Sequence, residues 1–256
     1  MKSLLPVLPT FVRKAARKIY TRLGPERPEA LMYRVHLFEE LQGLAGPGQL
    51  EGSRILEIGP RDGLDSVRLG SLEPAELVMM DLPEKQERVR SWLDQIQCPH
   101  QFIEANLMYM PQSEFAALGT FDVIWCTGVL YHNAEQLRLL RKLYKLLNKN
   151  GYLVLESSTA RGPRNIRGGA FVEIHYPQTF RDTGTVTHHP SKAAIWAWLQ
   201  MVGFGPIHDS DCFTRENWDL IDSRMACIAR KSSEDGADVY YGKSGLNPDY
   251  RFGDSS

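Results

Sequence analysis

The sequence lacks the features that define several protein classes. Its four cysteines include no C-x-x-C pair, so reduced structural thiols are predicted rather than a disulfide framework. No apolar run approaches the ~20 residues of a membrane-spanning helix, and prolines interrupt the apolar opening residues, which argues against a secretory signal. With 30 basic and 31 acidic residues, the chain has no global positive charge to attract a polyanion. These absences predict a cytoplasmic globular protein.

Acidic residues are also absent from residues 1–24, although this segment carries six basic ones with apolar residues between them at roughly helical spacing. We favour a helix packed on the domain with a solvated basic face, because single basic faces are common on soluble helices. Peripheral contact with an anionic membrane, binding of a polyanionic substrate and an organellar transit peptide remain open interpretations.

Short apolar runs alternate with helical patterns along most of the chain. The predicted strands cover residues 54–59, 77–81, 101–105, 121–126, 151–156, 206–213 and 224–230. The predicted helices cover residues 29–44, 63–72, 84–97 and 134–147, and one more lies between Ser191 and Gly203. Strands and helices alternate in this way when helical crossovers join parallel strands. We expect a helical N-terminal cap (1–50), a main domain (51–230) with a substrate-side loop (157–190), and a poorly ordered tail (231–256).

One glycine-containing turn follows the first predicted strand. Glu57, Gly59 and Gly63 occur there, and glycines at such a turn let the backbone bend sharply and approach a ligand. The second strand ends on Asp81, whose carboxylate can accept both hydroxyls of a ribose. The dinucleotide fingerprint G-x-G-x-x-G is absent, because Arg61 replaces its middle glycine. The carboxylate of Glu57 would repel a pyrophosphate, but it could attract the charged amino-acid end of an adenosyl cofactor.

These motifs resemble those of the class I S-adenosylmethionine-dependent methyltransferases over residues 50–230. The resemblance implies a Rossmann-like, doubly wound α/β fold: a mostly parallel seven-stranded sheet with an antiparallel last strand. It also implies S-adenosyl-L-methionine as cofactor. The positions that match its binding residues are Glu57, Gly59, Gly63, Asp81, Leu82, Asn106, Leu107 and Tyr131. Asn106 stands where the family has an acid that binds the adenine amino group, and its side-chain oxygen can still accept that hydrogen bond.

Two segments, residues 128–132 and 153–156, are similar to the bacterial tRNA wobble-uridine carboxymethyltransferases. In that family a tyrosine and an arginine, matched here by Tyr131 and Arg224, hold the extra carboxylate of carboxy-S-adenosylmethionine together with a lysine ahead of the first strand. Residues 24–53 contain no lysine. We therefore expect ordinary S-adenosylmethionine as the donor, with Arg224 as an outward-facing surface charge.

His132, at the carboxyl end of the fourth predicted strand, is the candidate catalytic base; a hydrogen-bonding residue that shapes the pocket is the equally weighted alternative. His175, His188 and His189 lack the spacing of a metal site, so we expect no metal and assign them to a solvated loop. The same segment groups arginines with aromatic residues, which suits a phosphate, a carboxylate or a stacked base. Its members are Arg161, Arg164, Arg167, Arg181, Phe171, Tyr176 and Phe180.

Three functions remain open. The first is methyl transfer to a small-molecule or glycan acceptor, which we favour. The second is RNA modification related to the wobble-uridine enzymes, for which the basic residues of 1–24 and 161–181 argue and the net charge of −1 argues against. The third is a non-catalytic subunit that binds S-adenosylmethionine. Its only support is that Arg61 and Asn106 depart from the motifs of the methyltransferase family.

Overall fold

The structure of the chain is a computed structural model, and it describes residues 32–61, 63–82, 92–161, 168–177, 185–215 and 223–232. The basic segment 1–24 and nearly all of the expected tail lie outside these residues. The elements in chain order are α2 (Met32–Ala45), β1 (Arg54–Ile58), α3 (Leu64–Gly70), β2 (Glu76–Asp81), β3 (His100–Glu104), α5 (Gln112–Ala117), β4 (Phe121–Thr127), η4 (Leu130–His132), α6 (Gln136–Leu146), β5 (Leu147–Ser158), β6 (Val172–His175), β7 (Thr187–Pro190), α8 (Lys192–Val202), β8 (Phe204–Asp209), α9 (Cys212–Arg215) and β9 (Arg224–Lys231).

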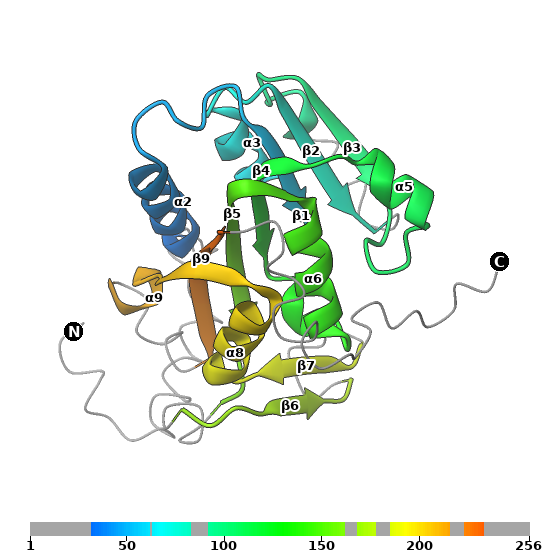
Figure 1. Cartoon of the computed structure of the whole chain (residues 1–256), viewed down its shortest axis with the longest axis vertical. Helices are drawn as coiled ribbons and strands as arrows, with labels where there is room; N and C mark the ends of the chain where they lie inside the picture. The colour runs from blue at the N-terminus through cyan, green and yellow to red at the C-terminus, as the bar shows by residue number, and fades with distance from the viewer. Residues whose placement is uncertain are drawn as a thin grey trace, which may run out of the picture.

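Seven strands form one twisted sheet in the order β3-β2-β1-β4-β5-β9-β8 (Figure 1). The pairs from β3 to β5 are parallel, whereas β9 runs antiparallel to both β5 and β8. This confirms the predicted doubly wound α/β fold with an antiparallel last strand. The strand order reverses beside β1, and in such sheets ligands bind outside the carboxyl ends of the strands at this point.

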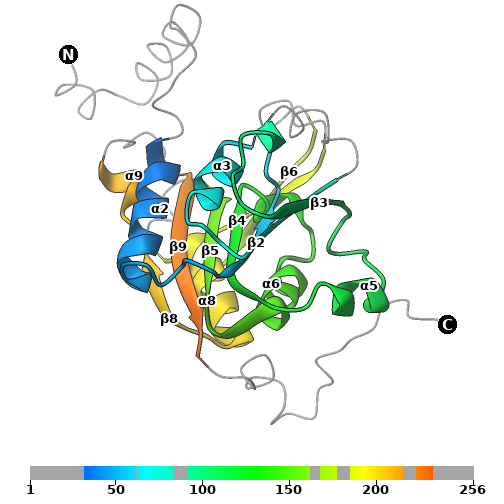
Figure 2. The same ribbon diagram turned by 90° about the horizontal axis from the view of Figure 1, so that it is seen from above.

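Helices cover both faces of the sheet, which explains the nearly continuous apolar strands. Along β4, Ile124 and Cys126 face the side of α6 and α8, while Val123 and Trp125 face the side of α2, α3 and α9. Figure 2 shows α2 beside α9, where the Tyr33 and Phe213 rings lie 4.9 Å apart. The segment expected as a cap therefore contributes to the core of the same domain. Its first described turn also reaches the carboxyl end of the sheet.

The buried cysteines agree with one further expectation. Cys98, Cys126, Cys212 and Cys227 are buried and free, which confirms the prediction of structural thiols, and burial raises the pKa of the Cys126 thiol to about 12. In the part of the chain that the structure describes, no helix has the length and apolar character needed to cross a membrane.

Two segments differ from the predicted elements. The stretch expected as a loop (157–190) contains an antiparallel hairpin of β6 and β7, which Figure 1 shows below α6 and α8. The strand expected over 206–213 ends at Asp209, because the Ser210 hydroxyl accepts the Cys212 backbone N–H at 3.2 Å and α9 begins there. Two strands are also longer than expected: β5 begins at Leu147, and β9 continues through Lys231.

Candidate functional site

The turn between β1 and α3 has the backbone that its glycines predict. Gly59 has a φ of 74° and Gly63 a φ of 79°, in the left-handed region that favours glycine. A Cβ at position 59 would lie 2.7 Å from Val129 Cγ2, and one at position 63 would lie 2.6 Å from Trp92 Cβ. At position 63, both the left-handed backbone and the packing against Trp92 require glycine.

Asp81 and Leu82 lie at the carboxyl end of β2, next to this turn. The Gly59 N–H donates to the Met80 carbonyl at 2.9 Å, which fixes the turn beside the end of β2. Asp81 Oδ1 accepts the Leu82 backbone N–H at 2.8 Å, and Leu82 is partly exposed. An acid at the end of the strand next to a glycine turn fits the ribose of an adenosyl cofactor.

The neighbouring strand end places Asn106 and Leu107. Asn106 Oδ1 accepts the Met108 backbone N–H at 2.9 Å, so one lone pair of the predicted adenine-binding oxygen closes a local turn. The Leu107 side chain packs in the core, and its carbonyl accepts the Lys142 Nζ at 2.7 Å. Leu107 would therefore contact a cofactor through its backbone rather than its side chain.

Glu57 lies beneath the glycine turn and is almost completely buried. Its Oε2 accepts the Ser66 hydroxyl at 2.5 Å, which joins β1 to α3. A buried carboxylate needs such partners. Glu57 thus holds the turn in place, and its negative charge lies below the position expected for the amino-acid end of the cofactor.

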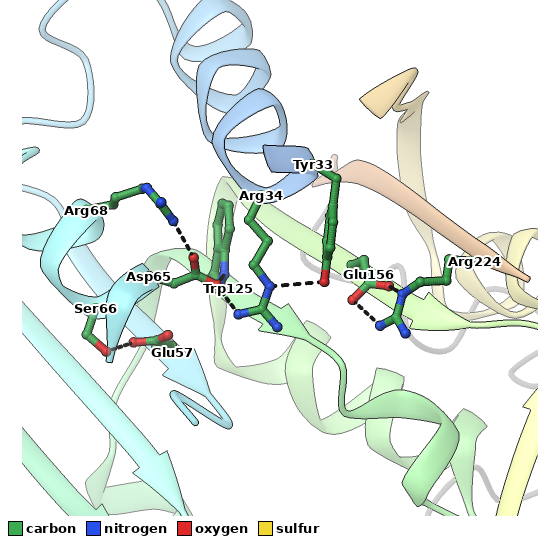
Figure 3. A network of polar contacts seen from close by, with 9 residues as sticks. All are labelled: Tyr33, Arg34, Glu57, Asp65, Ser66, Arg68, Trp125, Glu156 and Arg224. Carbon is green, nitrogen blue, oxygen red and sulfur yellow. Dashed lines mark hydrogen bonds and ion pairs between the residues drawn. The ribbon is translucent and has the colours of Figure 1, made fainter. Parts of the chain in front are cut away.

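A polar network at the carboxyl end of the sheet includes residues that the sequence did not reveal (Figure 3). Arg34, on the first described turn of α2, donates to Asp65 Oδ2 at 2.6 Å and to the Tyr33 hydroxyl at 3.0 Å. Asp65 also accepts from Arg68 at 2.9 Å and from the Trp125 indole at 3.2 Å. Burial alone would lower the Arg34 pKa, but Tyr33 and Asp65 raise it above its usual value. Arg34 is therefore a buried, charged residue with a carboxylate partner.

The second half of this network joins β5 to β9. Arg224 forms a bidentate pair with Glu156, Nε to Oε1 at 2.5 Å and Nη2 to Oε2 at 2.8 Å, and it also donates to the Ser158 hydroxyl at 3.1 Å. The Glu156 side chain is fully buried and that of Arg224 is 14% exposed. The expectation that Arg224 is an outward surface charge is therefore wrong. Burial, and next the Glu156 charge, raise the pKa of Tyr33.

Aromatic rings connect this pair to the β6–β7 hairpin. The Arg224 guanidinium lies 6.0 Å from the centre of the Tyr131 ring, and Tyr131 contacts the His132 and His189 rings at 4.1 and 5.3 Å. His132 is exposed, so the candidate base is accessible. His189 is only 1% exposed, so the assignment of this histidine to a solvated loop is wrong. Burial, and next the charge of His175, lower the pKa of His189 to about 4, so its imidazole is neutral at neutral pH.

The apolar spacing of α2 is the one feature of the sequence that indicates a buried position for Arg34. Arg34 precedes Leu37 and Leu41 by three and seven residues, so it lies on the buried stripe of α2, where a charge requires a partner. Arg34 also lies close to the end of β4. A Cβ built on Gly128, the residue that follows this strand, would be 3.8 Å from the Nη2 atom of Arg34. Across the described residues, no group of three or more histidine, cysteine or acidic side chains has the geometry to hold a metal ion.

The residues at this edge of the sheet fit an adenosyl methyl donor: a glycine turn, an acid for the ribose, and charged groups at the ends of β4 and β5. The profile of the methyltransferase-domain family matches residues 11–209. Two curated relatives are tRNA U34 carboxymethyltransferases, from Desulforapulum autotrophicum (30% identical over 159 residues, 60% of this chain and 45% of the relative) and Haemophilus influenzae (30% over 173 residues, 64% and 49%). The chain thus spans about half the length of these relatives.

A solved structure with a similar fold is the 1,6-didemethyltoxoflavin-N1-methyltransferase of Burkholderia thailandensis, with bound 1,6-didemethyltoxoflavin and S-adenosylhomocysteine. Its TM-score is 0.59 at 15% identity, covering 86% of this chain and 84% of that one. At this identity the likeness concerns the fold. Together, the profile and this fold support S-adenosylmethionine as the methyl donor.

Proposed function

We propose that this chain, which belongs to the methyltransferase-domain family, transfers the methyl group of S-adenosylmethionine to a small-molecule or glycan acceptor. When bound, the donor supplies an electrophilic methyl group on a sulfonium, and its transfer is an in-line displacement that depends mainly on alignment. The task of the protein is therefore to bind and orient the donor and the acceptor. A base is needed only where the acceptor atom carries a proton.

Each end of the donor has a counterpart among the described residues. The glycine turn with Gly59 and the acid Asp81 would hold the adenosine. Arg34, beside Gly128, is placed to pair with the carboxylate of the amino-acid end, and Glu57 lies below with the opposite charge. Tyr131 and His132 follow β4 directly and would line the acceptor side.

The observation that carries the choice of donor is the pairing of Arg224 with Glu156. The Arg224 guanidinium gives both Nε and Nη2 to this one carboxylate, whereas Arg34 has its Nη2 beside Gly128, where the amino-acid end would lie. Desolvating the extra carboxylate of carboxy-S-adenosylmethionine is unfavourable where the cation that would face it, Arg224, already has a buried partner. We therefore infer ordinary S-adenosylmethionine.

A second candidate function is carboxymethyl transfer to a tRNA wobble uridine. The names of the curated relatives favour it, and so do Tyr131 and Arg224, which match the tyrosine and arginine of that family. Three exposed residues at or next to the β6–β7 hairpin are uncharged: Val172, Ile174 and Tyr176. An apolar surface of this kind, if it faces the acceptor, argues against a polyanionic acceptor such as tRNA.

Competition between the two donors tests the proposal. The purified chain is titrated with S-adenosylmethionine and with carboxy-S-adenosylmethionine in a calorimeter, and the ligand that copurifies is identified by mass spectrometry. We expect S-adenosylmethionine to bind at least tenfold more tightly, which corresponds to about 1.4 kcal/mol. A preference for the carboxylated donor would contradict the proposal and favour wobble uridine as the acceptor.

A further inference from the structure

A cavity of about 310 Å³ lies where the start of α6 meets β6 and α8 (Figure 1). Cavities that bind small ligands range from about 300 to 1,000 Å³, so this one has room for a single ring. Its lining begins at Ala134, two residues after His132, and two trans peptides separate the Cα atoms by at most about 7.6 Å. The cavity therefore adjoins the acceptor side of the proposed site.

Gln136 lines this cavity and is only 3% exposed. Its Nε2 donates to the Leu130 carbonyl at 3.2 Å and to the His188 carbonyl at 2.6 Å, so both amide hydrogens are used. Because two carbonyls fix the position of the NH₂ group, the other end of the amide is the acceptor Oε1. Among the described residues, no donor contacts Oε1. A buried acceptor needs a donor, and a ligand in the cavity can supply it.

The charges in the cavity lining cancel. Arg138 Nη1 lies 3.2 Å from Glu135 Oε1 and 3.4 Å from its Oε2, and the two side chains are 39% and 46% exposed. No other described residue of the lining is charged. An anion would meet Glu135 as well as Arg138, so the lining favours a neutral ligand. The pair also presents an acceptor and a donor side by side, which matches neighbouring hydroxyl groups.

The remaining wall of the cavity is apolar. Leu137 and Trp198 pack partly on the core, and Val172 of β6 is 40% exposed. An indole and two aliphatic side chains suit the C–H face of a ring, while the polar groups suit hydroxyls on its edge. A ring without hydroxyl groups would leave Gln136 Oε1 without a donor, which is unfavourable for a buried acceptor.

Resting on the proposed function, we propose that this cavity is a subsite for one neutral sugar ring of a glycan acceptor. One hydroxyl of the ring donates to Gln136 Oε1, neighbouring hydroxyls meet the pair of Glu135 and Arg138, and the C–H face lies against Trp198. The subsite holds this sugar next to the unit that receives the methyl group beside His132. The inference thus selects the glycan from the two proposed acceptor classes.

NMR titration of the full chain tests the subsite with three probes: methyl β-D-glucopyranoside, methyl β-D-galactopyranoside and methyl α-L-rhamnopyranoside. The indole N–H signal of Trp198 is identified as the one missing from Trp198→Phe. At least one glycoside should shift this signal, and benzyl alcohol, a ring with a single hydroxyl group, should shift it less. No shift with any glycoside, or a larger shift with benzyl alcohol, overturns the inference.

A pair of matched variants locates the binding. Val172→Phe adds an aromatic ring that gains by packing into the apolar wall, so it competes with the sugar and should weaken glycoside binding by at least about tenfold. The control is Ile174→Phe, because Ile174 lies on the same face of β6, is 54% exposed and does not line the cavity. This variant should keep the wild-type affinity. Wild-type affinity in Val172→Phe, or an equal loss in both variants, overturns the inference.

Calorimetry with S-adenosylmethionine separates the two proposals. Donor binding by the wild type without glycoside binding overturns the sugar subsite alone. Absence of donor binding contradicts the proposed function, whichever result the glycosides give.

Discussion

The buried pair of Glu156 and Arg224 leads to a prediction with two parts. In Glu156→Gln the amide keeps the shape of the side chain but loses the charge that neutralises Arg224, whose side chain is 14% exposed. Removing one partner of a buried pair typically costs 3–5 kcal/mol. Because the amide oxygen can keep one hydrogen bond, we expect the free energy of unfolding to fall by about 3 kcal/mol. The freed charge should also raise the affinity for carboxy-S-adenosylmethionine relative to S-adenosylmethionine by about tenfold.

Urea unfolding measures the first part, and competition calorimetry with the two donors measures the second. The control is Glu76→Gln, which breaks a pair of the same chemistry at the amino end of the sheet: Arg54 Nε lies 2.6 Å from Glu76 Oε2, and both side chains are about one-third exposed. An exposed pair contributes about 0–1 kcal/mol, so this variant should unfold nearly as the wild type does and keep its donor preference. If both variants behave alike, the buried pair does not set the donor.

Three further variants test the remaining parts of the site. Asp81→Ala should weaken binding of S-adenosylmethionine by ~1.5–3 kcal/mol, because a charged acceptor is lost, and calorimetry checks it; unchanged affinity would remove Asp81 from the site. Gly59→Ala should lower the free energy of unfolding in urea by at least about 1–2 kcal/mol, since an L-residue is strained at a φ of 74°, and should also abolish donor binding. His189→Gln should flatten the dependence of stability on pH. Because folding lowers the pKa of His189 from 6.5 to about 4, the unfolded chain takes up a proton first, and the wild type should lose about 2 kcal/mol between pH 7 and pH 5. An unchanged slope in the variant would contradict this assignment.

The fold could be predicted because its strands are short apolar runs at regular spacing. The runs ending at Ile58 and Asp81 became β1 and β2, since buried parallel strands require apolar residues on both faces. The glycine turn was predictable for the same local reason, because only glycine adopts its backbone without strain. The hairpin of β6 and β7 was missed, since its strands are four residues long and stand between polar and glycine-rich segments.

The electrostatics of the site could not be predicted, because the partners are distant in sequence. Arg34 and Asp65 are 31 residues apart, and Glu156 and Arg224 are 68 residues apart. From the sequence, Arg224 can be matched to a position of a related family, but its partner Glu156 cannot be identified. The register of β5 with β9, which places Ser158 opposite Arg224, brings that guanidinium to Glu156, and the proposed choice of donor rests on this pair.

Calorimetric titration with S-adenosylmethionine and, separately, with NAD tests the central claim most directly, because both ligands contain an adenosine that Asp81 and the glycine turn could hold. Only the first has a sulfonium and an amino-acid end to match the charges of Arg34 and Glu57. We predict one S-adenosylmethionine bound per chain and no measurable binding of NAD. Tight binding of NAD without binding of S-adenosylmethionine would contradict the account.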